Sequence, residues 1–252
     1  MPHPPLQAGN GHHRRSGTDG TRPCPRSPGL PTPRPTERTE RTEPAGPAER
    51  IGLFGGTFDP PHLGHVAALR AVSRALPLDR LLLVVANDPW QKSSSRAVTP
   101  AEDRFAMAQA LADGMPGVEA SRMEIDRGGP SYTVTTVEAL RAEALASGRP
   151  VPQIYLVIGA DLLADLGTWE RAGDLAEMVT LAVVSRPPIT SGTGRLRTVP
   201  PGWRLEWVEG PLVDVSSSAV RDVLERGGPV DELVPAAVMH CIRRRNLYAV
   251  HR

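Results

Sequence analysis

Uninterrupted apolar runs alternate along the chain with segments whose apolar residues recur at helical spacing. Such runs are typical of strands that a parallel sheet buries on both faces. They lie at 51–54, 80–86, 153–158 and 179–184, and two weaker strands are expected near 118–125 and 205–208. Helical spacing predicts helices at about 66–76, 99–112, 134–145, 169–177, 216–227 and 235–244. This alternation predicts an α/β protein with a doubly wound parallel sheet and helices on both faces, binding ligands outside the carboxyl ends of its strands.

Residues at two helix starts and in one linking segment refine this picture. Thr99, Pro100 and Glu102 fit a capping box, with Thr99 as the N-cap and Pro100 in the first turn. The three serines at 216–218 provide hydroxyls where another helix is expected to begin. The segment 186–203 contains Pro, Gly, Thr and Ser and is predicted to form a mobile loop.

The first 49 residues differ from the rest in composition. They contain 11 prolines and many Arg, Ser, Thr and Gly residues, but no Phe, Tyr, Trp, Val or Ile. Such a segment cannot bury enough apolar surface to offset its conformational entropy. We therefore expect a disordered Pro/Arg-rich tail at 1–49, without the apolar region of a signal peptide, followed by one domain at 50–252.

The overall composition narrows the class of protein. A chain of 252 residues suffices for one α/β domain with a sizeable core. Its 29 basic and 28 acidic residues give no global charge for binding nucleic acid or a membrane. Only two cysteines occur, so no disulfide framework is expected and the cytoplasm is the predicted location. The longest clean apolar run, 81–86, is far shorter than the roughly 20 residues that cross a bilayer.

The segment 55–65 carries the strongest functional signal. It reads Gly-Gly-Thr-Phe-Asp-Pro-Pro-His-Leu-Gly-His and lies between the first predicted strand and the first predicted helix. Gly55 and Gly56 allow a bulky anion to approach the backbone, and the N–H groups of a helix start favour negative charge. His62 and His65 are three residues apart, so they share one face of the first helical turn. Two imidazoles beside a phosphate site indicate phosphoryl or nucleotidyl transfer.

Each part of this segment also has an ordinary structural interpretation. A Gly-Gly pair often forms only a turn, and a histidine at a helix start often caps the helix or lies on the surface. The histidine pair could bind a metal ion, but no acidic residue or cysteine cluster accompanies it at the spacing of a zinc site. The eleven residues together favour the anion site. They differ from the G-x-G-x-x-G pattern of dinucleotide-dependent oxidoreductases.

Two candidate phosphate contacts follow other predicted strands. Lys92, after the second strand, could contact a substrate phosphate as a mobile charge, although such lysines are normally only solvated. The segment 127–133, Arg-Gly-Gly-Pro-Ser-Tyr-Thr, leads into a helix start whose free N–H groups suit a carboxylate or phosphate. Ser131 or Thr133 could equally be an ordinary cap of that helix.

Three further candidates lie later in the chain. Asp161, at the end of the fourth long apolar run, could cap a helix or accept hydrogen bonds from ribose hydroxyls. Trp169 could belong to the core or stack on an aromatic ring of a ligand. The segment 215–221 adds hydroxyls and an arginine to a helix start, where they would favour an anion.

Taken in order, these motifs resemble those of bacterial nicotinate-nucleotide adenylyltransferases. Residues 55–65 are similar to the G-T-F-D-P-x-H-x-G-H signature of a nucleotidyltransferase superfamily with a Rossmann-like sheet. P-W-Q-K, D-R-G-G-P-S-Y-T, I-G-A-D, T-W, S-R-P and S-S-S-x-x-R follow in the family's order, with wording most similar to the actinobacterial branch. The resemblance covers about 51–249. It implies that AMP is transferred from ATP, bound with Mg²⁺, to nicotinate mononucleotide, giving deamido-NAD and pyrophosphate in NAD biosynthesis.

The resemblance also implies roles for individual residues. The catalytic set would be His62, His65 and Arg221. The ATP-binding set would be Gly55, Gly56, Thr57, Phe58, Gly159, Asp161, Ser217 and Ser218. The mononucleotide set would be Lys92 near the phosphate and Tyr132, Thr133 and Trp169 around the nicotinate, with Trp169 stacked on the pyridine ring.

The chain departs from the family's pattern at three places. Ser218 replaces a Thr of the last motif and keeps the hydroxyl. His240 replaces a Tyr at an expected packing position. Asn87 and Asp88 replace small residues before P-W-Q-K, and Asp88 adds negative charge near the expected phosphate site.

The implied reaction needs no protein nucleophile, because a phosphate oxygen of the mononucleotide attacks. Positioning and charge compensation would supply most of the rate. His62 and His65 are therefore expected to be hydrogen-bond donors or cations, not general bases. Three alternatives stay open: a related adenylyltransferase or cytidylyltransferase with another acceptor such as pantetheine phosphate, use of nicotinamide mononucleotide, and a non-catalytic nucleotide-binding module.

Overall fold

The computed structural model describes residues 46–89, 97–185, 201–211 and 213–248. The chain divides into two units, Met1–Thr42 and Glu43–Arg252, and the fold below belongs to the second. The tail predicted at 1–49 and the loop predicted at 186–203 lie almost wholly outside the described residues, so both stay predictions.

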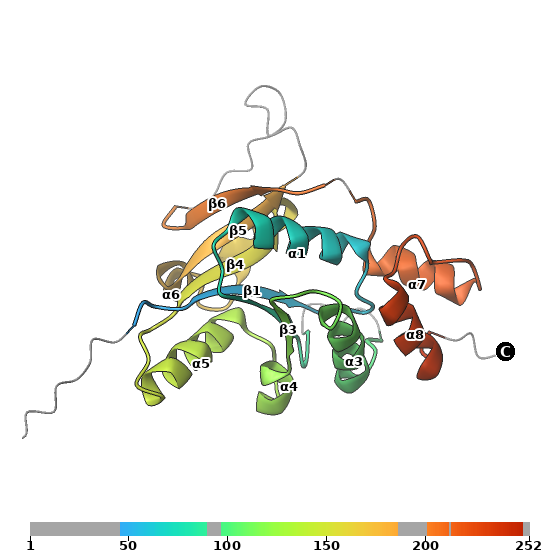
Figure 1. Ribbon diagram of the computed structural model, residues 1–252, viewed down its shortest axis with the longest axis horizontal. Coiled ribbons are helices and arrows are strands. Elements are labelled where there is room, and N and C mark those ends of the chain that lie inside the picture. The colour runs from blue at the N-terminus through green and yellow to red at the C-terminus, as the bar shows by residue number, and fades with distance from the viewer. Residues whose placement is uncertain (1–45, 90–96, 186–200, 212, 249–252) are drawn as a thin grey trace, which may run out of the picture. The chain divides into compact units, whose positions relative to one another are not determined.

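Six parallel strands form one sheet in the order β3-β2-β1-β4-β5-β6 (Figure 1). Their bounds are β1 Arg50–Gly56, β2 Arg80–Val85, β3 Val118–Ser121, β4 Gln153–Gly159, β5 Val179–Ser185 and β6 Arg204–Glu209. The chain winds outward from β1 to β3, returns to β4 on the other side of β1, and continues to β6. Ligands of such sheets bind where the winding reverses, beyond the carboxyl ends of β1 and β4. The predicted α/β class with a doubly wound parallel sheet is confirmed.

Helices pack against both faces of the sheet. Along β2, Leu81, Leu83 and Val85 belong to one buried cluster, and Leu82 and Val84 belong to another. The first cluster also contains residues of α1 (Leu63–Ala75), α3 (Ala101–Ala112), α7 (Ser217–Glu225) and α8 (Ala236–Arg244), and the second contains residues of α5 (Thr133–Ala146), the 3₁₀ helix η1 (Ala160–Thr168) and α6 (Ala172–Met178). A strand covered on both faces needs an apolar side chain at every position, which explains the uninterrupted runs.

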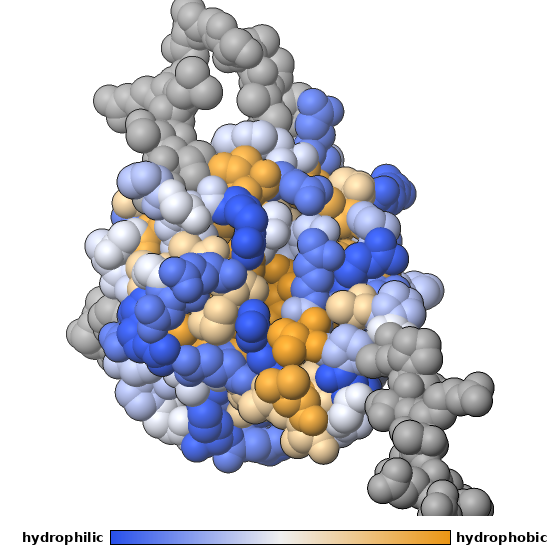
Figure 2. All heavy atoms as spheres, turned by 90° about the vertical axis from the view of Figure 1, so that its left-hand side faces the viewer, coloured by the Kyte–Doolittle hydropathy of each residue, from blue (hydrophilic) through white to orange (hydrophobic). Residues whose placement is uncertain are grey.

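One face of the domain is mainly polar. On the side shown in Figure 2, hydrophilic residues predominate and apolar residues form small groups between them. Among the described residues, the exposed large apolar side chains are Leu145, Leu162 and Trp207. Within the same part of the chain, no helix has the length and apolar character needed to span a bilayer.

Two predicted elements differ from the structure. The strand expected to reach residue 125 ends at Ser121, and the short helix α4 (Met123–Arg127) follows. Ser121 pairs with Val84 and β2 ends one residue later at Val85, so a strand reaching residue 125 would have no partner for its last residues. The helix expected from about 169 begins at Ala172, because residues 169–171 form a bend and turn in which Arg171 has a left-handed φ of 48°.

The predicted cap of α3 is also wrong. This helix begins at Ala101 with Pro100 at the N-cap, and no side chain caps it. Thr99 instead provides a carbonyl oxygen to the side chain of Arg104, 2.7 Å from Nε. The segment before α3 is therefore fixed by a buried arginine and not by a capping box.

Arg104 is a buried cation, with only 1% of its surface exposed. Its Nη1 donates to the carbonyl oxygens of Thr57 at 3.1 Å and Ala86 at 2.6 Å, and its Nη2 donates to that of Asn87 at 2.9 Å. A buried guanidinium is tolerated when its donors find acceptors, and main-chain carbonyls meet that need. Arg104 thereby joins α3 to the segments that follow β1 and β2.

Replacing Arg104 with methionine (R104M) should lower the free energy of unfolding by about 3 kcal/mol, because buried carbonyl oxygens lose their donor. Urea unfolding followed by circular dichroism measures the change. Arg74 on α1 is exposed and provides the control, since R74M should change the free energy by less than about 0.5 kcal/mol. Small and equal effects of the two substitutions would contradict the proposed role of Arg104.

Candidate functional site

Two adjoining cavities open at the carboxyl ends of β1 and β4. The larger, about 700 Å³, contains His62 and His65 and is called the histidine cavity. The smaller, about 410 Å³, contains Trp169 and is called the tryptophan cavity. The residues common to both are Phe54, Gly55, Gly56, Thr57, Val157, Ile158, Gly159 and Leu162. The pair therefore lies where a doubly wound sheet is expected to bind its ligands.

The end of β1 and the loop after it line the histidine cavity with all four residues predicted there, 55–58. A Cβ at Gly55 would meet no atom within 4 Å, so a ligand can approach this backbone. A Cβ at Gly56 would lie 2.7 Å from Cζ of Phe58. Phe58 is buried, has a left-handed φ of 51°, and packs edge-on against His65 with ring centroids 5.1 Å apart. Gly56 is thus required by the packing of an aromatic ring within the loop itself.

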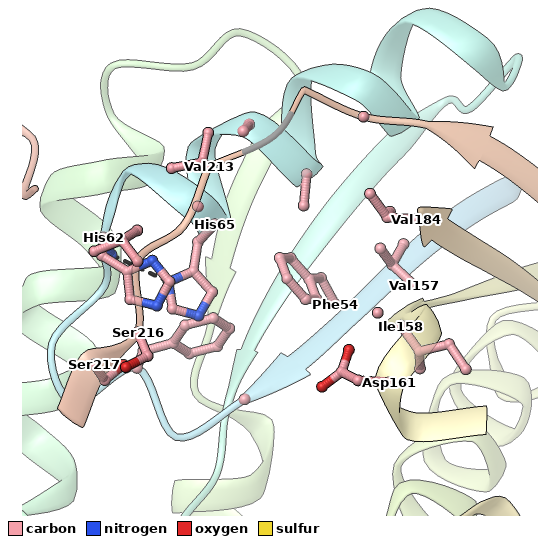
Figure 3. Close-up of a pocket in the computed structure, with 18 of the residues that line it drawn as sticks. Phe54, His62, His65, Val157, Ile158, Asp161, Val184, Val213, Ser216 and Ser217 are labelled. Atoms are coloured by element: carbon pink, nitrogen blue, oxygen red, sulfur yellow. Dashed lines mark hydrogen bonds between the residues drawn. The ribbon is translucent and has the colours of Figure 1, made fainter. Parts of the chain in front are cut away.

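The two imidazoles lie side by side at the start of α1 (Figure 3). Their ring centroids are 3.8 Å apart and the ring planes differ by 36°. The backbone N–H of His62 donates to Nδ1 of His65 at 3.1 Å. Because Nδ1 of His65 accepts this bond, the proton of its neutral ring lies on Nε2. His65 is therefore held in the tautomer that has its donor at the far end of the ring.

His62 is more buried than the sequence indicated. Its side chain is 8% exposed, and its Nδ1 has no hydrogen-bond partner within the described structure. Burial lowers the pKa of His62 to about 4, so the ring is neutral at pH 7. A Cβ at Gly64 would lie 2.9 Å from this Nδ1, which explains the glycine between the two histidines. Of the two roles expected for His62, the protein without ligand favours the neutral donor over the cation.

The start of α7 is bonded to the loop that follows β1. Ser216 caps α7 by accepting a backbone N–H at 3.2 Å, within the range where this helix start was predicted. Ser217 Oγ donates to the carbonyl oxygen of Pro60 at 2.9 Å. Nη1 of Arg221 donates to the carbonyl oxygen of Asp59 at 2.6 Å. The serines and the arginine predicted from a distant motif are therefore brought against the glycine-histidine segment.

Two other predicted residues line the histidine cavity. Ser218 Oγ accepts a hydrogen bond from Nη2 of Arg221 at 3.0 Å, so the serine at this position orients the guanidinium. Asp161 belongs to η1 and lies across the cavity from the histidines (Figure 3). A Cβ at Gly159 would overlap Oδ1 of Asp161, so the glycine leaves space for this carboxylate.

The tryptophan cavity includes part of the predicted mononucleotide set. Thr133, the first residue of α5, and Trp169, the residue after η1, both line it. Tyr132 does not line it, because its ring packs against the buried cluster on that face of the sheet. The role of Tyr132 at the mononucleotide stays a prediction. Lys92 lies outside the described residues, so its role stays a prediction.

Glu124 also lines the tryptophan cavity and was missed from the sequence. The residue is 7% exposed. Its carboxylate accepts a hydrogen bond from the hydroxyl of Thr136, and Arg127 donates to that same hydroxyl at 3.3 Å. The sequence pattern placed this residue in a strand, which hid its position in α4. Its place three residues before Arg127 is the one signal that could have associated it with the Arg-Gly-Gly segment.

The unusual Asn87 has a structural explanation, whereas the side chain of Asp88 has none. The backbone N–H of Asn87 donates to Ser131 Oγ at 2.9 Å, and its side-chain amide donates to the carbonyl oxygen of Gly129 at 2.9 Å. The N–H of Ser131 donates to the carbonyl oxygen of Asp88 at 3.1 Å. These bonds fix the segment before α5, whose N-cap has no side-chain hydrogen bond, so neither Ser131 nor Thr133 caps it. Asp88 is not among the residues that line the two cavities.

His240 was expected at a packing position, and that expectation is wrong. The residue is exposed on α8. The side chains of α8 that reach the core are Val238, Met239, Cys241 and Ile242. The replacement of a tyrosine by histidine therefore changes a surface position.

Comparison with known proteins gives a consistent result. The family model described as cytidylyltransferase-like matches residues 53–223. A probable nicotinate-nucleotide adenylyltransferase of Acidothermus cellulolyticus is 38% identical over 81% of this chain and 96% of its own length. The protein of that name from Streptomyces coelicolor is 39% identical over 77% of this chain and 98% of its own. The Plasmodium falciparum nicotinic acid mononucleotide adenylyltransferase complexed with NaAD has a similar fold, with a TM-score of 0.63 at 17% identity, covering 79% of this chain and 97% of its own.

The neutral, buried state of His62 predicts a loss of stability in acid. Its pKa is 6.5 in the unfolded chain and about 4 in the folded protein, so the unfolded state binds more protons between these values. Stability should therefore fall as the pH drops from 6.5 towards 4, by roughly 3 kcal/mol in total. Urea unfolding at a series of pH values measures this, and the variant H62N should lack that part of the loss. Parallel curves for the two proteins would show that the ring is not buried in its neutral form.

Proposed function

The chain belongs to the nicotinate-nucleotide adenylyltransferase family of cytidylyltransferase-like proteins, and on that premise we propose how its two cavities share one reaction. The histidine cavity binds ATP and the tryptophan cavity binds nicotinate mononucleotide. AMP passes between them, giving deamido-NAD and pyrophosphate. The observation that carries this proposal is that the cavities adjoin along a common wall at the ends of β1 and β4, so two nucleotides can meet there.

The histidine cavity suits a triphosphate. The starts of α1 and α7 both border it, and each helix start favours negative charge. Arg221 adds a guanidinium that its bonds to Asp59 and Ser218 hold in one orientation. His65 adds the donor at Nε2. The carboxylate of Asp161, on the far side, is suited to accept hydrogen bonds from the ribose hydroxyls of ATP.

The tryptophan cavity suits a pyridine nucleotide. Trp169 offers an aromatic face for stacking on the nicotinate ring. Thr133 begins α5, a helix of 14 residues without a side-chain cap, and its first N–H groups favour the nicotinate carboxylate. Lys92 is proposed to contact the mononucleotide phosphate, on the family resemblance alone.

The chemistry is an in-line displacement at the α-phosphorus of ATP. A phosphate oxygen of the mononucleotide forms a bond to that phosphorus as the bond to the bridging oxygen of pyrophosphate breaks. Both reactants are anions, so the protein contributes by holding them in line and by placing donors beside the charge. His62 and His65 act as such donors. The phosphates would also raise the pKa of His62 from its low value, because they supply the opposite charge that burial denies it.

Magnesium is proposed to arrive with ATP. Among the described residues, no group of three or more His, Cys, Asp or Glu side chains is arranged to hold a metal ion. The carboxylates that line the histidine cavity are those of Asp59 and Asp161. This donor set fits a magnesium ion that keeps phosphate and water oxygens as most of its ligands. Such an ion offsets phosphate charge when it is bound.

The acceptor is tested by assaying the protein with ATP and one candidate acceptor at a time. Pyrophosphate release should show a higher kcat/KM for nicotinate mononucleotide than for nicotinamide mononucleotide or pantetheine phosphate, because an anion is favoured at the start of α5. A higher value for another acceptor would reassign the tryptophan cavity. No release with any acceptor would indicate a non-catalytic nucleotide-binding protein.

The role of His65 is tested by H65A. Removing one preorganised donor should lower kcat by about 10²-fold or more at saturating substrate. H240A provides a matched control, because His240 is exposed on α8, and its kcat should stay within about twofold of the unmodified protein. Near-normal turnover of a folded H65A protein would refute the assignment.

A further inference from the structure

Asp59 lies in the glycine-histidine segment and is almost completely buried, at 1% exposure. Its Oδ1 accepts the hydroxyl of Tyr248 at 2.7 Å, a bond between residues 189 positions apart in the chain. Its Oδ2 lies 4.0 Å from Nη1 of Arg221, the same atom that donates to the carbonyl oxygen of Asp59. One buried carboxylate is thus close to both a phenol and the cation proposed to hold the triphosphate.

Tyr248 is held firmly in place after α8. The N–H of Leu247 donates to the carbonyl oxygen of Ile242 at 3.0 Å, and Tyr248 itself has a left-handed φ of 58°. Its hydroxyl also lies 3.8 Å from Sδ of Met107. Burial, together with the negative charge of Asp59, holds the pKa of this phenol well above its usual range. The hydroxyl therefore keeps its proton and donates a hydrogen bond to the carboxylate.

A buried carboxylate is stable only when donors or cations compensate its charge. Arg221 is 13% exposed and is the described cation that borders the histidine cavity. The hydrogen bond from the Tyr248 hydroxyl offsets part of the negative charge of Asp59. The guanidinium of Arg221 therefore has to offset less of that charge. Without this hydrogen bond, the carboxylate would draw Nη1 inward from its present distance of 4.0 Å.

We propose that Tyr248 is a positioning residue for ATP binding, which acts through Asp59 by leaving the guanidinium of Arg221 directed at the triphosphate. The proposal rests on the assignment of ATP to the histidine cavity. It does not depend on which acceptor occupies the tryptophan cavity. A residue distant in sequence from every motif of the site would thus set the affinity for one of the two substrates.

The test is a double-mutant cycle read by ATP binding. Calorimetry with a non-hydrolysable ATP analogue compares the unmodified protein, Y248F, D59N and Y248F/D59N. We expect Y248F to weaken binding of the analogue by about tenfold, the usual scale for a buried acceptor that loses one donor. In the D59N background there is no charge to compensate, so Y248F should change the affinity by less than about twofold.

Two further measurements separate positioning from packing. The KM for the mononucleotide should change by less than about twofold in Y248F, because the effect concerns Arg221 alone. Y155F is the matched control, since Tyr155 is a buried tyrosine of β4 whose hydroxyl accepts Gln153 Nε2 at 3.0 Å and lines neither cavity. It should leave ATP affinity unchanged.

Each remaining outcome decides the matter. Unchanged ATP affinity in Y248F overturns the proposal, and so does an equal loss in the Asp59 and D59N backgrounds, which would indicate packing only. Should Y248F alone fail to fold, the double variant is expected to fold and bind like D59N, and its failure would contradict the proposal. An unmodified protein that does not bind the analogue overturns the proposed function as well, whereas a defect confined to the variants leaves that function standing.

Discussion

The candidate active site depends on the hydrogen bonds that the carbonyl oxygens of the loop after β1 accept. A carbonyl oxygen carries partial negative charge, so several of them beside a phosphate site would oppose anion binding. Three carbonyl oxygens of this loop accept hydrogen bonds from side chains. The pairs are Arg104 with Thr57, Arg221 with Asp59 and Ser217 with Pro60. These bonds offset the partial charge of the three carbonyl oxygens and fix the shape of the loop, which leaves the first turn of α1 for the ligand.

The same loop explains the state of the histidines. His62 is buried and neutral, which avoids the cost of an uncompensated buried charge. His65 is held in one tautomer by the backbone of His62. The two imidazoles are therefore oriented before the phosphates bind. Only the positive charge of His62 depends on the phosphates. Preorganisation of this kind is the main contribution that a protein can make when the substrates supply both the nucleophile and the leaving group.

The sequence predicted the parts of the molecule that follow a regular period or a long motif. Continuous apolar runs revealed the buried strands, because both faces of the sheet impose the same requirement. The strand predicted at 118–125 was too long because β2 ends at Val85, one residue beyond the partner of Ser121, a limit that no residue of β3 expresses. The helix η1 was missed because 3₁₀ segments lack the period that identifies an α-helix.

The predicted site residues largely line the two cavities, but the residues that hold them were not visible. Arg104 and Tyr248 belong to no motif, and their partners lie 5 to 47 and 189 positions away in the chain. The burial of His62 follows from packing around Gly64 and not from its spacing to His65. Of the segment 127–133, Ser131 and Thr133 line the tryptophan cavity, whereas Tyr132 packs against the buried cluster on that face of the sheet. Motifs thus indicate where a ligand is held, whereas long-range contacts decide what state each residue adopts.

The most direct test of the central claim is a crystal structure of the protein with a non-hydrolysable ATP analogue and nicotinate mononucleotide. The account predicts that the triphosphate lies between His65 Nε2 and the start of α7, with the pyridine ring on Trp169 and the acceptor phosphate directed at the α-phosphorus. Nucleotides bound elsewhere, or phosphates that contact neither His65 nor Arg221, would contradict it.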